Sequence, residues 1–311
     1  MSWQSALMCW VLRHKMRPAT ATPGIDVARA RAMTSKRAWS PKVPRGWHLE
    51  ERYADNDAPL RGEWLSPEMR PGITPDITIL YLHGGGYYFC SPATHRNLVF
   101  AFARRSGARI FSLDYRLAPE HPFPAALDDA LAACRKLVAD GVSPQSLVIA
   151  GDSAGGGLAL AVLLALRDAG DPLPAGAVVF SPWTDLAATG ASITTNDDRD
   201  DMFHGRAIAP AGKLYTGSAD VRNPYVSPLY GRFEGLPPLF IQAGDTEVLL
   251  DDSTRVAEKA RAAGVSVELE VLPNMPHALQ MFAPFVPEAN RALERAARFV
   301  RRIAVRQLET A

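Results

Sequence analysis

Short runs of apolar residues alternate along the chain with longer stretches in which apolar residues recur every three to four positions. Three of the runs are ITILYL (77–82), ARIFSLDY (108–115) and SLVIA (146–150), whose β-branched and aliphatic side chains favour buried strands. Helical spacing follows in PAALDDALAACRKLVADG (124–141) and GLALAVLLALRDAG (157–170). Runs without polar alternation are typical of strands that are covered on both faces, as in a parallel sheet.

The alternation continues to the end of the sequence. Further strands are predicted at AGAVVFS (175–181), PLFIQAG (238–244) and VSVELEVL (265–272), and further helices at 252–264 and 291–307. The last helix carries Leu293, Ala296, Val300 and Ile303 on one face, so its arginines are expected to face solvent. The whole pattern predicts an α/β fold with a mostly parallel central sheet and helices on both faces.

Two stretches, residues 1–45 and 184–235, lack this rhythm. A long segment between a strand and its successor is usually functional, such as a lid. We expect both stretches to pack together over the carboxyl edge of the sheet, where open α/β sheets bind ligands. The predicted organisation is therefore an N-terminal cap segment (1–45), a first core part (46–183), a cap insertion (184–235) and a second core part (236–311).

The N-terminal stretch contains one helical pattern. Trp3, Leu7, Trp10 and Val11 recur at helical spacing, which predicts an amphipathic helix that docks through this apolar stripe. No basic region precedes the apolar residues, and they are too few to span a bilayer. This disfavours both a cleaved signal peptide and stable membrane insertion.

Composition narrows the classes of function. The net charge is +1 with both signs interspersed, so no nucleic-acid partner is expected. Three cysteines, Cys9, Cys90 and Cys134, are too few for a disulfide framework, and their number is odd. They fit a reducing compartment, so we expect a cytoplasmic protein. The Cys and His residues show no metal-ligand spacing, and no metal site is predicted.

The strongest chemical signal is the pentapeptide GDSAG at 151–155, which lies between a predicted strand and a predicted helix. A G-x-S-x-G sequence in this context is the nucleophile elbow, a sharp turn that exposes a reactive serine. The small residues permit the strained backbone of Ser153, and the start of the helix favours negative charge there. We therefore predict that Ser153 is a catalytic nucleophile.

A serine that attacks a carbonyl generates an oxyanion, which needs preorganised hydrogen-bond donors. Gly84, Gly85 and Gly86 follow the strand at 77–82 and offer backbone N–H groups that no side chain obstructs. Ala154, directly after the nucleophile, offers another at the start of the helix. His83 is expected to shape this loop as a structural hydrogen-bonding residue.

The general base is expected after the last strand, because elbow hydrolases carry their triad in the order serine, acid, histidine. Among seven histidines, His277 alone has this position, in VLPNMPHALQMF. The acid should follow the strand at 238–244. The segment DTEVLLDD offers four carboxylates there: Asp245, Glu247, Asp251 and Asp252.

Taken together, five motifs resemble the hormone-sensitive-lipase-like family of α/β-hydrolases. They are HGGG (83–86), DYRLAPEHPFPAALDD (114–129), GDSAGGG (151–157), NPYVSPL (223–229) and MPHALQMF (275–282). The resemblance implies an α/β-hydrolase fold with an α-helical cap, and a carboxylesterase that cleaves short-chain esters through an acyl-enzyme without a cofactor. It also implies that Gly85, Gly86 and Ala154 form the oxyanion hole.

The acid segment departs from the family pattern and looks similar to that of monoterpene lactone hydrolases. Glu247 stands where the family carries its catalytic Asp, and glutamate also serves this role in elbow hydrolases. Asp251 and Asp252 precede a helix, where acidic residues are favoured, and Asp245 lies near enough to the strand end to hold the loop backbone. We take Glu247 as the acid and Asp245 as the alternative.

A small-molecule ester is thus the expected substrate. Gly84, Tyr87, Tyr88, Phe89 and Trp183 are predicted to line its binding site, although a core role for the aromatic residues is nearly as well supported. Three alternatives share the same residues: a lactone hydrolase, an amidase, and a non-catalytic protein that binds a small molecule on this scaffold. A homodimer is left open.

Overall fold

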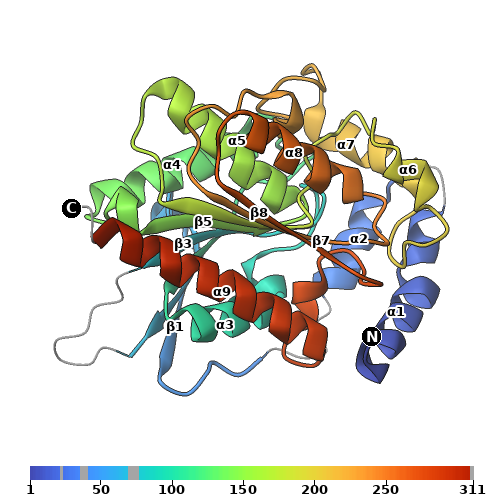
Figure 1. Ribbon diagram of the computed structural model, residues 1–311, viewed down its shortest axis with the longest axis horizontal. Coiled ribbons are helices and arrows are strands. Elements are labelled where there is room, and N and C mark those ends of the chain that lie inside the picture. Colours follow the sequence, from blue (N-terminus) through green and yellow to red (C-terminus); the bar gives the residue numbers. More distant parts are fainter. Residues whose placement is uncertain (22–23, 36–40, 69–76, 309–311) are drawn as a thin grey trace.

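The computed structural model describes residues 1–21, 24–35, 41–68 and 77–308. Parts of the predicted N-terminal cap segment, residues 22–23 and 36–40, lie outside the described residues. A central eight-stranded sheet lies between two layers of helices (Figure 1). Its strand order is β1-β2-β4-β3-β5-β6-β7-β8; the pairs β1–β2 and β2–β4 are antiparallel and all the others are parallel.

The elements have the following bounds. The strands are β1 Trp47–Arg52, β2 Gly62–Pro67, β3 Thr78–Leu82, β4 Arg109–Leu113, β5 Leu147–Asp152, β6 Gly176–Phe180, β7 Leu239–Gly244 and β8 Val267–Leu272. The α-helices are α1 Trp3–Lys15, α2 Val27–Ser35, α3 Pro92–Ser106, α4 Ala125–Ala139, α5 Ala154–Ala169, α6 Ser192–Thr195, α7 Ile208–Thr216, α8 Leu250–Ala262 and α9 Pro287–Leu308.

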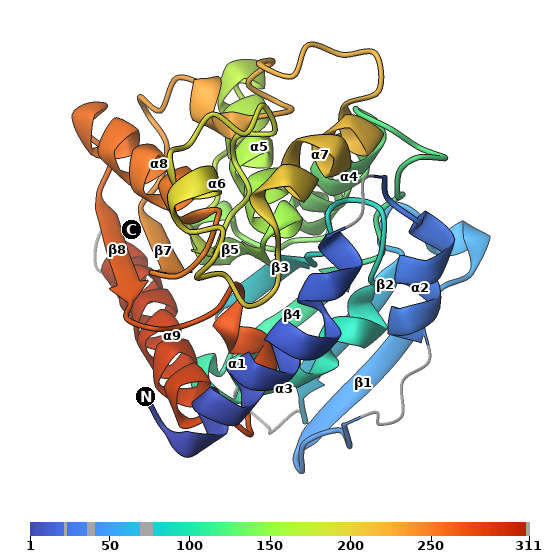
Figure 2. The same ribbon diagram turned by 90° about the vertical axis from the view of Figure 1, so that its right-hand side faces the viewer.

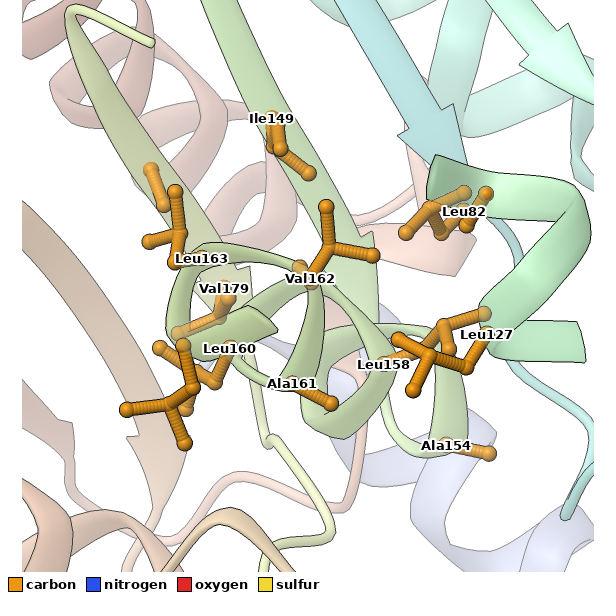
Figure 3. Close-up of a cluster of buried hydrophobic side chains, with 14 of the residues drawn as sticks. Leu82, Leu127, Ile149, Ala154, Leu158, Leu160, Ala161, Val162, Leu163 and Val179 are labelled. Atoms are coloured by element: carbon orange, nitrogen blue, oxygen red, sulfur yellow. The ribbon is translucent and has the colours of Figure 1, made fainter. Parts of the chain in front are cut away.

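Alternate residues of the central strands enter two separate cores. In β3, Leu80 and Leu82 belong to the core beneath α4, α5 and α8. Ile79 and Tyr81 point to the opposite side and join the core that includes α3 and α9. Figure 3 shows the first core around α5, which packs against β5 directly behind the elbow. Because both faces are buried, the strands carry continuous apolar runs.

These elements confirm the predicted α/β fold and its mostly parallel sheet. The terminal helix α9 buries Leu293, Ala296, Val300 and Ile303, as its spacing predicted. The antiparallel strands β1 and β2 were not predicted, because every residue of β1 is at least partly exposed and β2 carries a buried acid, Glu63. The Glu63 carboxylate is paired with the Arg96 guanidinium, 2.7 Å away, and this pairing offsets the cost of its burial.

Helices α1, α2, α6 and α7 gather on one side of the molecule, on the right in Figure 1 and facing the viewer in Figure 2. The N-terminal segment contacts the segment between β6 and β7 directly. Arg13 Nε lies 2.8 Å from Asp201 Oδ1, and Arg17 lies 3.8 Å from Asp197. The two stretches without strand rhythm therefore touch one another.

The predicted docking face of α1 is wrong. Ser5, Met8 and Leu12 are buried, whereas the stripe of Trp3, Leu7, Trp10 and Val11 is exposed. The helix has apolar residues on two faces, so periodicity alone could not identify the buried one. Ser5 belongs to that face because its hydroxyl donates to Glu288 of α9 at 2.7 Å. No helix in the described part of the chain is long and apolar enough to cross a membrane.

Candidate active site

Ser153 lies on the turn between β5 and α5, in a strained conformation with φ 52° and ψ −123°. The turn brings backbone groups so close together that only glycine fits two positions before Ser153 and two positions after it. A Cβ on Gly151 would overlap the carbonyl of Gly155, and a Cβ on Gly155 would overlap the carbonyl oxygen of Leu82 at the end of β3. The GDSAG sequence therefore forms the strand–turn–helix geometry of a nucleophile elbow.

His277 and Glu247 form a buried pair on the loops after β8 and β7. His277 Nδ1 lies 2.8 Å from Glu247 Oε2, and both side chains are almost completely buried. Burial alone would lower the pKa of His277, but the charge of Glu247 and its hydrogen bond raise that pKa above its ordinary value. His277 Nε2 is buried and has no hydrogen-bond partner among the described residues. This nitrogen is available to a nucleophile or a substrate.

The other carboxylates of the acid segment have different partners. Asp245 accepts a hydrogen bond from Asn274 N at 2.6 Å and pairs with Arg199 at 3.4 Å. Asp252 accepts from the amides of Thr184 and Asp185, and burial raises its pKa to about 7. Asp251, also in the first turn of α8, accepts from Ser192 N at 3.1 Å. Of the four candidates, only Glu247 has a hydrogen bond to His277 among the described contacts.

The glycine loop after β3 faces the elbow. Gly85 and Gly86 have φ values of 112° and 57°, a region that favours glycine, and their amides make no hydrogen bond within the described residues. The Ala154 amide is the first of α5, where no intrahelical carbonyl can accept it. The Gly84 amide, by contrast, donates to Asp152 Oδ1 at 3.0 Å. Three of the four candidate amides are thus left for an oxyanion, and that of Gly84 is not.

Asp152 holds this loop in place, a role that sequence analysis missed. Its carboxylate is buried and accepts from Tyr81 Oη at 2.7 Å as well as from Gly84 N, and it lies 3.2 Å from His95 Nε2. Burial alone would raise the pKa of Asp152, but His95 and the Tyr81 hydrogen bond lower it below its ordinary value. Asp152, in its ionised form, therefore fixes the start of the glycine loop.

His83 has a structural position, as expected. Its ring stacks on Tyr115 with centroids 4.3 Å apart, and its Nδ1 lies 2.7 Å from Gly84 O. Burial lowers the pKa of His83 to about 3, so the ring is neutral near pH 7.

A turn after β6, residues 181–183, connects Ser153 to Glu247 through hydrogen bonds. Trp183 N donates to Ser153 O at 2.9 Å, which joins the turn to the elbow. Ser181, with φ 46°, donates from Oγ to Glu247 Oε1 at 2.6 Å and accepts from Ala278 N at 3.0 Å. The amide of Gly244 donates to the same carboxylate oxygen. The role of Ser181 was not predicted, although its place as the last residue of a predicted strand was a usable signal.

Removing the Ser181 hydroxyl is expected to lower kcat about 10- to 100-fold with little change in KM, because a charge-assisted hydrogen bond to Glu247 is lost. Ser181→Gly and Ser181→Ala should both be measured, since glycine also relieves the positive φ and alanine does not. Equal losses would identify the hydroxyl as the cause. Wild-type kcat in Ser181→Gly would contradict this role.

The cap insertion also binds the acid loop, through three residues spaced four apart that we call the acid-loop clasp: Ser192, Asn196 and Asp200. Ser192 Oγ donates to Val248 O at 2.7 Å, and Asn196 Nδ2 donates to Glu247 O at 2.8 Å. Asp200 accepts from Val248 N at 2.8 Å and from the amides of Met202 and Phe203. Asn196 Nδ2 also donates to Asp245 O at 3.1 Å, so the clasp engages the backbone both before and after Glu247.

The aromatic residues predicted to line a pocket fall into two groups. Tyr87 and Trp183 are buried core residues. The Tyr87 ring stacks on that of Tyr215 in α7 with centroids 3.7 Å apart, and the Trp183 ring centroid lies 6.2 Å from that of Tyr87. Tyr88 and Phe89 are half-buried beside Gly86, with ring centroids 4.9 Å apart. Phe203 of the cap insertion, a weaker candidate for the pocket on sequence, packs edge-on against the His277 ring, with the ring centroids 5.1 Å apart. The described residues contain no cluster of three or more metal-ligating side chains.

Several known proteins resemble this chain. A model of the alpha/beta hydrolase fold family matches residues 79–281. An acetyl-hydrolase of Streptomyces hygroscopicus is 46% identical over 239 residues, which cover 77% of this chain and 79% of that protein. An esterase of Acinetobacter venetianus is 37% identical over 78% of this chain and 79% of its own length.

Solved structures resemble nearly the whole chain. EstE5, crystallised and soaked with p-nitrophenyl butyrate, is 40% identical and covers 98% of this chain and 100% of its own, with a TM-score of 0.88. An esterase from the bacterial hormone-sensitive lipase family is 39% identical, with a TM-score of 0.84, and covers 98% of this chain and 99% of its own.

Proposed function

Because this chain belongs to the alpha/beta hydrolase fold family and resembles hormone-sensitive-lipase-family esterases over nearly its whole length, it is a carboxylesterase, and we propose that Ser153, His277 and Glu247 form its catalytic triad. The observation that carries this assignment is the buried His277–Glu247 pair, in which His277 Nε2 has no hydrogen-bond partner within the described part of the chain. Substitution of Ser153 tests it, as set out in the Discussion.

The mechanism follows from the geometry of each group. Ser153 Oγ attacks the ester carbonyl while His277 Nε2 takes its proton. Glu247 accepts the Nδ1 hydrogen, which fixes the tautomer with a free Nε2 and stabilises the imidazolium that forms. The imidazolium then protonates the leaving alkoxide, and an acyl-enzyme remains on Ser153. A water molecule, deprotonated by the same nitrogen, hydrolyses it.

The negative oxygen of each tetrahedral intermediate is bound by the amides of Gly85, Gly86 and Ala154 in this proposal. None of the three amides has an acceptor among the described residues, so they need not break a hydrogen bond when the oxyanion forms. Asp152 supports this arrangement by holding the preceding amide, that of Gly84, away from the substrate. Ser181 and the acid-loop clasp position Glu247 from two sides.

We propose short acyl chains as the preferred substrates. Phe203 packs on one side of the His277 ring, and Tyr88 and Phe89 lie beside the glycine loop, so we expect these rings to confine the acyl group. Two similar proteins support this choice by name: one is an acetyl-hydrolase, and crystals of the other were soaked with a butyrate ester.

Accordingly, p-nitrophenyl esters with C2 to C6 acyl chains are expected to give kcat/KM values at least tenfold above those of C12 and longer chains, because each long chain must leave the confined space. The measurement is kcat/KM across the series at submicellar concentrations. A maximum at C12 or beyond would contradict the confined site. Lactones and anilides belong in the same panel, since a lactone hydrolase or an amidase would use the same triad.

Three finer expectations remain predictions. The similarity to monoterpene lactone hydrolases is tested by the lactones of that panel. A cytoplasmic location is proposed from the free thiols of Cys9 and Cys134, neither of which forms a disulfide. A homodimer is tested by sedimentation.

A further inference from the structure

Helix α1 presents an uncovered apolar stripe to solvent. The exposed fraction is 73% for Trp3, 53% for Leu7, 56% for Trp10 and 41% for Val11. Their spacing places these residues along one side of the helix over little more than two turns. Figures 1 and 2 both place α1 at the outside of the molecule. Two exposed tryptophans in a continuous stripe are unusual on a water-facing surface and mark an interaction site.

The stripe is not a face that awaits packing within this chain, because the opposite face already anchors α1. Glu288 of α9 accepts hydrogen bonds from Ser2 N, Ser2 Oγ and Ser5 Oγ at 2.7–2.8 Å. Met8 and Leu12 enter the core. At the other end, the Arg13 guanidinium pairs with Asp201 and donates to two carbonyls of the cap insertion. The helix is therefore held rigidly with its tryptophans outward.

The N-terminal segment that carries the stripe is strongly basic in sequence. Residues 1–45 contain nine Lys or Arg and one Asp, whereas the remaining 266 residues contain 25 Lys or Arg and 32 Asp or Glu. Arg13, Arg17 and Arg31 are paired with carboxylates of the cap and core. Lys15, one turn beyond Val11, and Arg29 on α2 are exposed. An apolar stripe with tryptophans, bordered by cations, is typical of a helix that lies in the surface of an anionic membrane.

We propose that α1 adsorbs this enzyme to anionic lipid surfaces, with Trp3, Leu7 and Trp10 in the headgroup region and Lys15 and Arg29 near lipid phosphates. A second copy fits the stripe less well. In a symmetric dimer the same patch faces itself, so the cations of two N-terminal segments would approach one another. The adsorption is peripheral, and it does not depend on the proposed catalytic triad.

The test uses the full chain and vesicles of either phosphatidylcholine alone or a three-to-one mixture of phosphatidylcholine and phosphatidylglycerol. Sedimentation of the vesicles measures the bound fraction at low and high salt. The combined variant Trp3→Gln, Leu7→Gln and Trp10→Gln is expected to bind the anionic vesicles at least about tenfold more weakly than wild type. Phe285→Gln, another exposed apolar residue at 61%, is the matched control and should bind like wild type.

The charge contribution needs its own pair of variants. Lys15→Glu with Arg29→Glu should weaken binding and reduce its salt dependence, because salt screens surface charge. Arg232→Glu with Arg298→Glu, two exposed arginines outside the N-terminal segment, should not. Brominated lipids should quench the tryptophan fluorescence of wild type but not that of the double variant Trp3→Gln, Trp10→Gln. Because the wild-type measurement needs no variant, this readout still tests the proposal if the triple variant fails to fold.

Three results would overturn the proposal. Wild type could fail to bind the anionic vesicles, or the stripe variants could bind as tightly as wild type. Alternatively, sedimentation equilibrium could show a dimer that the triple variant abolishes, which would mean that a second copy covers the stripe.

Discussion

Replacing Ser153 by alanine is expected to lower kcat for a short-chain ester by about 10⁶-fold, the scale on which loss of a triad nucleophile acts. The fold should persist, because alanine preserves the small Cβ at this strained position and the Ser153 hydroxyl caps no backbone group of α5. The residual rate reports the oxyanion donors and substrate binding alone. Stopped assays with concentrated enzyme measure the residual rate. Mass spectrometry after treatment with a serine-directed phosphonate identifies the residue that the reagent modifies.

Ser146→Ala serves as the matched control, since it removes a serine hydroxyl from a turn before β5 rather than after it. It should keep wild-type activity. If Ser153→Ala retained activity within tenfold of wild type while labelling persisted elsewhere, Ser153 would not be the nucleophile.

The second large effect is expected from Glu247→Gln, which should lower kcat by roughly 10³- to 10⁴-fold. The amide is nearly isosteric, so Ser181 and Gly244 can still donate to its oxygen. What is lost is the charge that stabilises the His277 imidazolium and the acceptor that selects the tautomer with a free Nε2. Asp245→Asn is the matched control. It removes a charge that contacts Asn274 N and Arg199, so a far smaller loss is expected.

The same variant makes a prediction about pH. In wild type the base must be neutral, so activity is lost as pH falls through the pKa of His277, which Glu247 raises above its ordinary value. Without that charge, burial dominates and lowers the pKa, so the acidic limb of the kcat/KM profile should move to lower pH in Glu247→Gln. An unmoved limb, or a larger loss in Asp245→Asn than in Glu247→Gln, would reassign the acid.

Local patterns predicted the parallel strands and the elbow because each depends on a few neighbouring residues. An apolar run such as ITILYL needs no knowledge of its partners, and GDSAG between a strand and a helix has few other structural solutions. The buried face of α1 could not be predicted in this way. Two apolar faces compete on that helix, and the outcome depends on Glu288, which is nearly three hundred residues away in the sequence.

The residues that orient Glu247 were beyond local reasoning for a similar reason. Ser181, Asn196 and Asp200 are ordinary loop residues whose partners come from other strands and loops, so no spacing within one segment reveals them. The choice between Glu247 and Asp245 was open on position alone. In the structure the Glu247 carboxylate contacts the histidine and the Asp245 carboxylate contacts a loop amide, which supports the proposal of Glu247 as the acid.

The acid-loop clasp changes how the cap insertion can be regarded. A lid that merely covers a site is a separable module, which recombination can exchange between relatives. Here Ser192, Asn196 and Asp200 of the insertion hold the backbone on both sides of Glu247, and the same segment carries Phe203 against His277. The cap and the acid loop are therefore one inheritable unit. We therefore expect that a chimera that takes a new cap must also take a compatible acid loop.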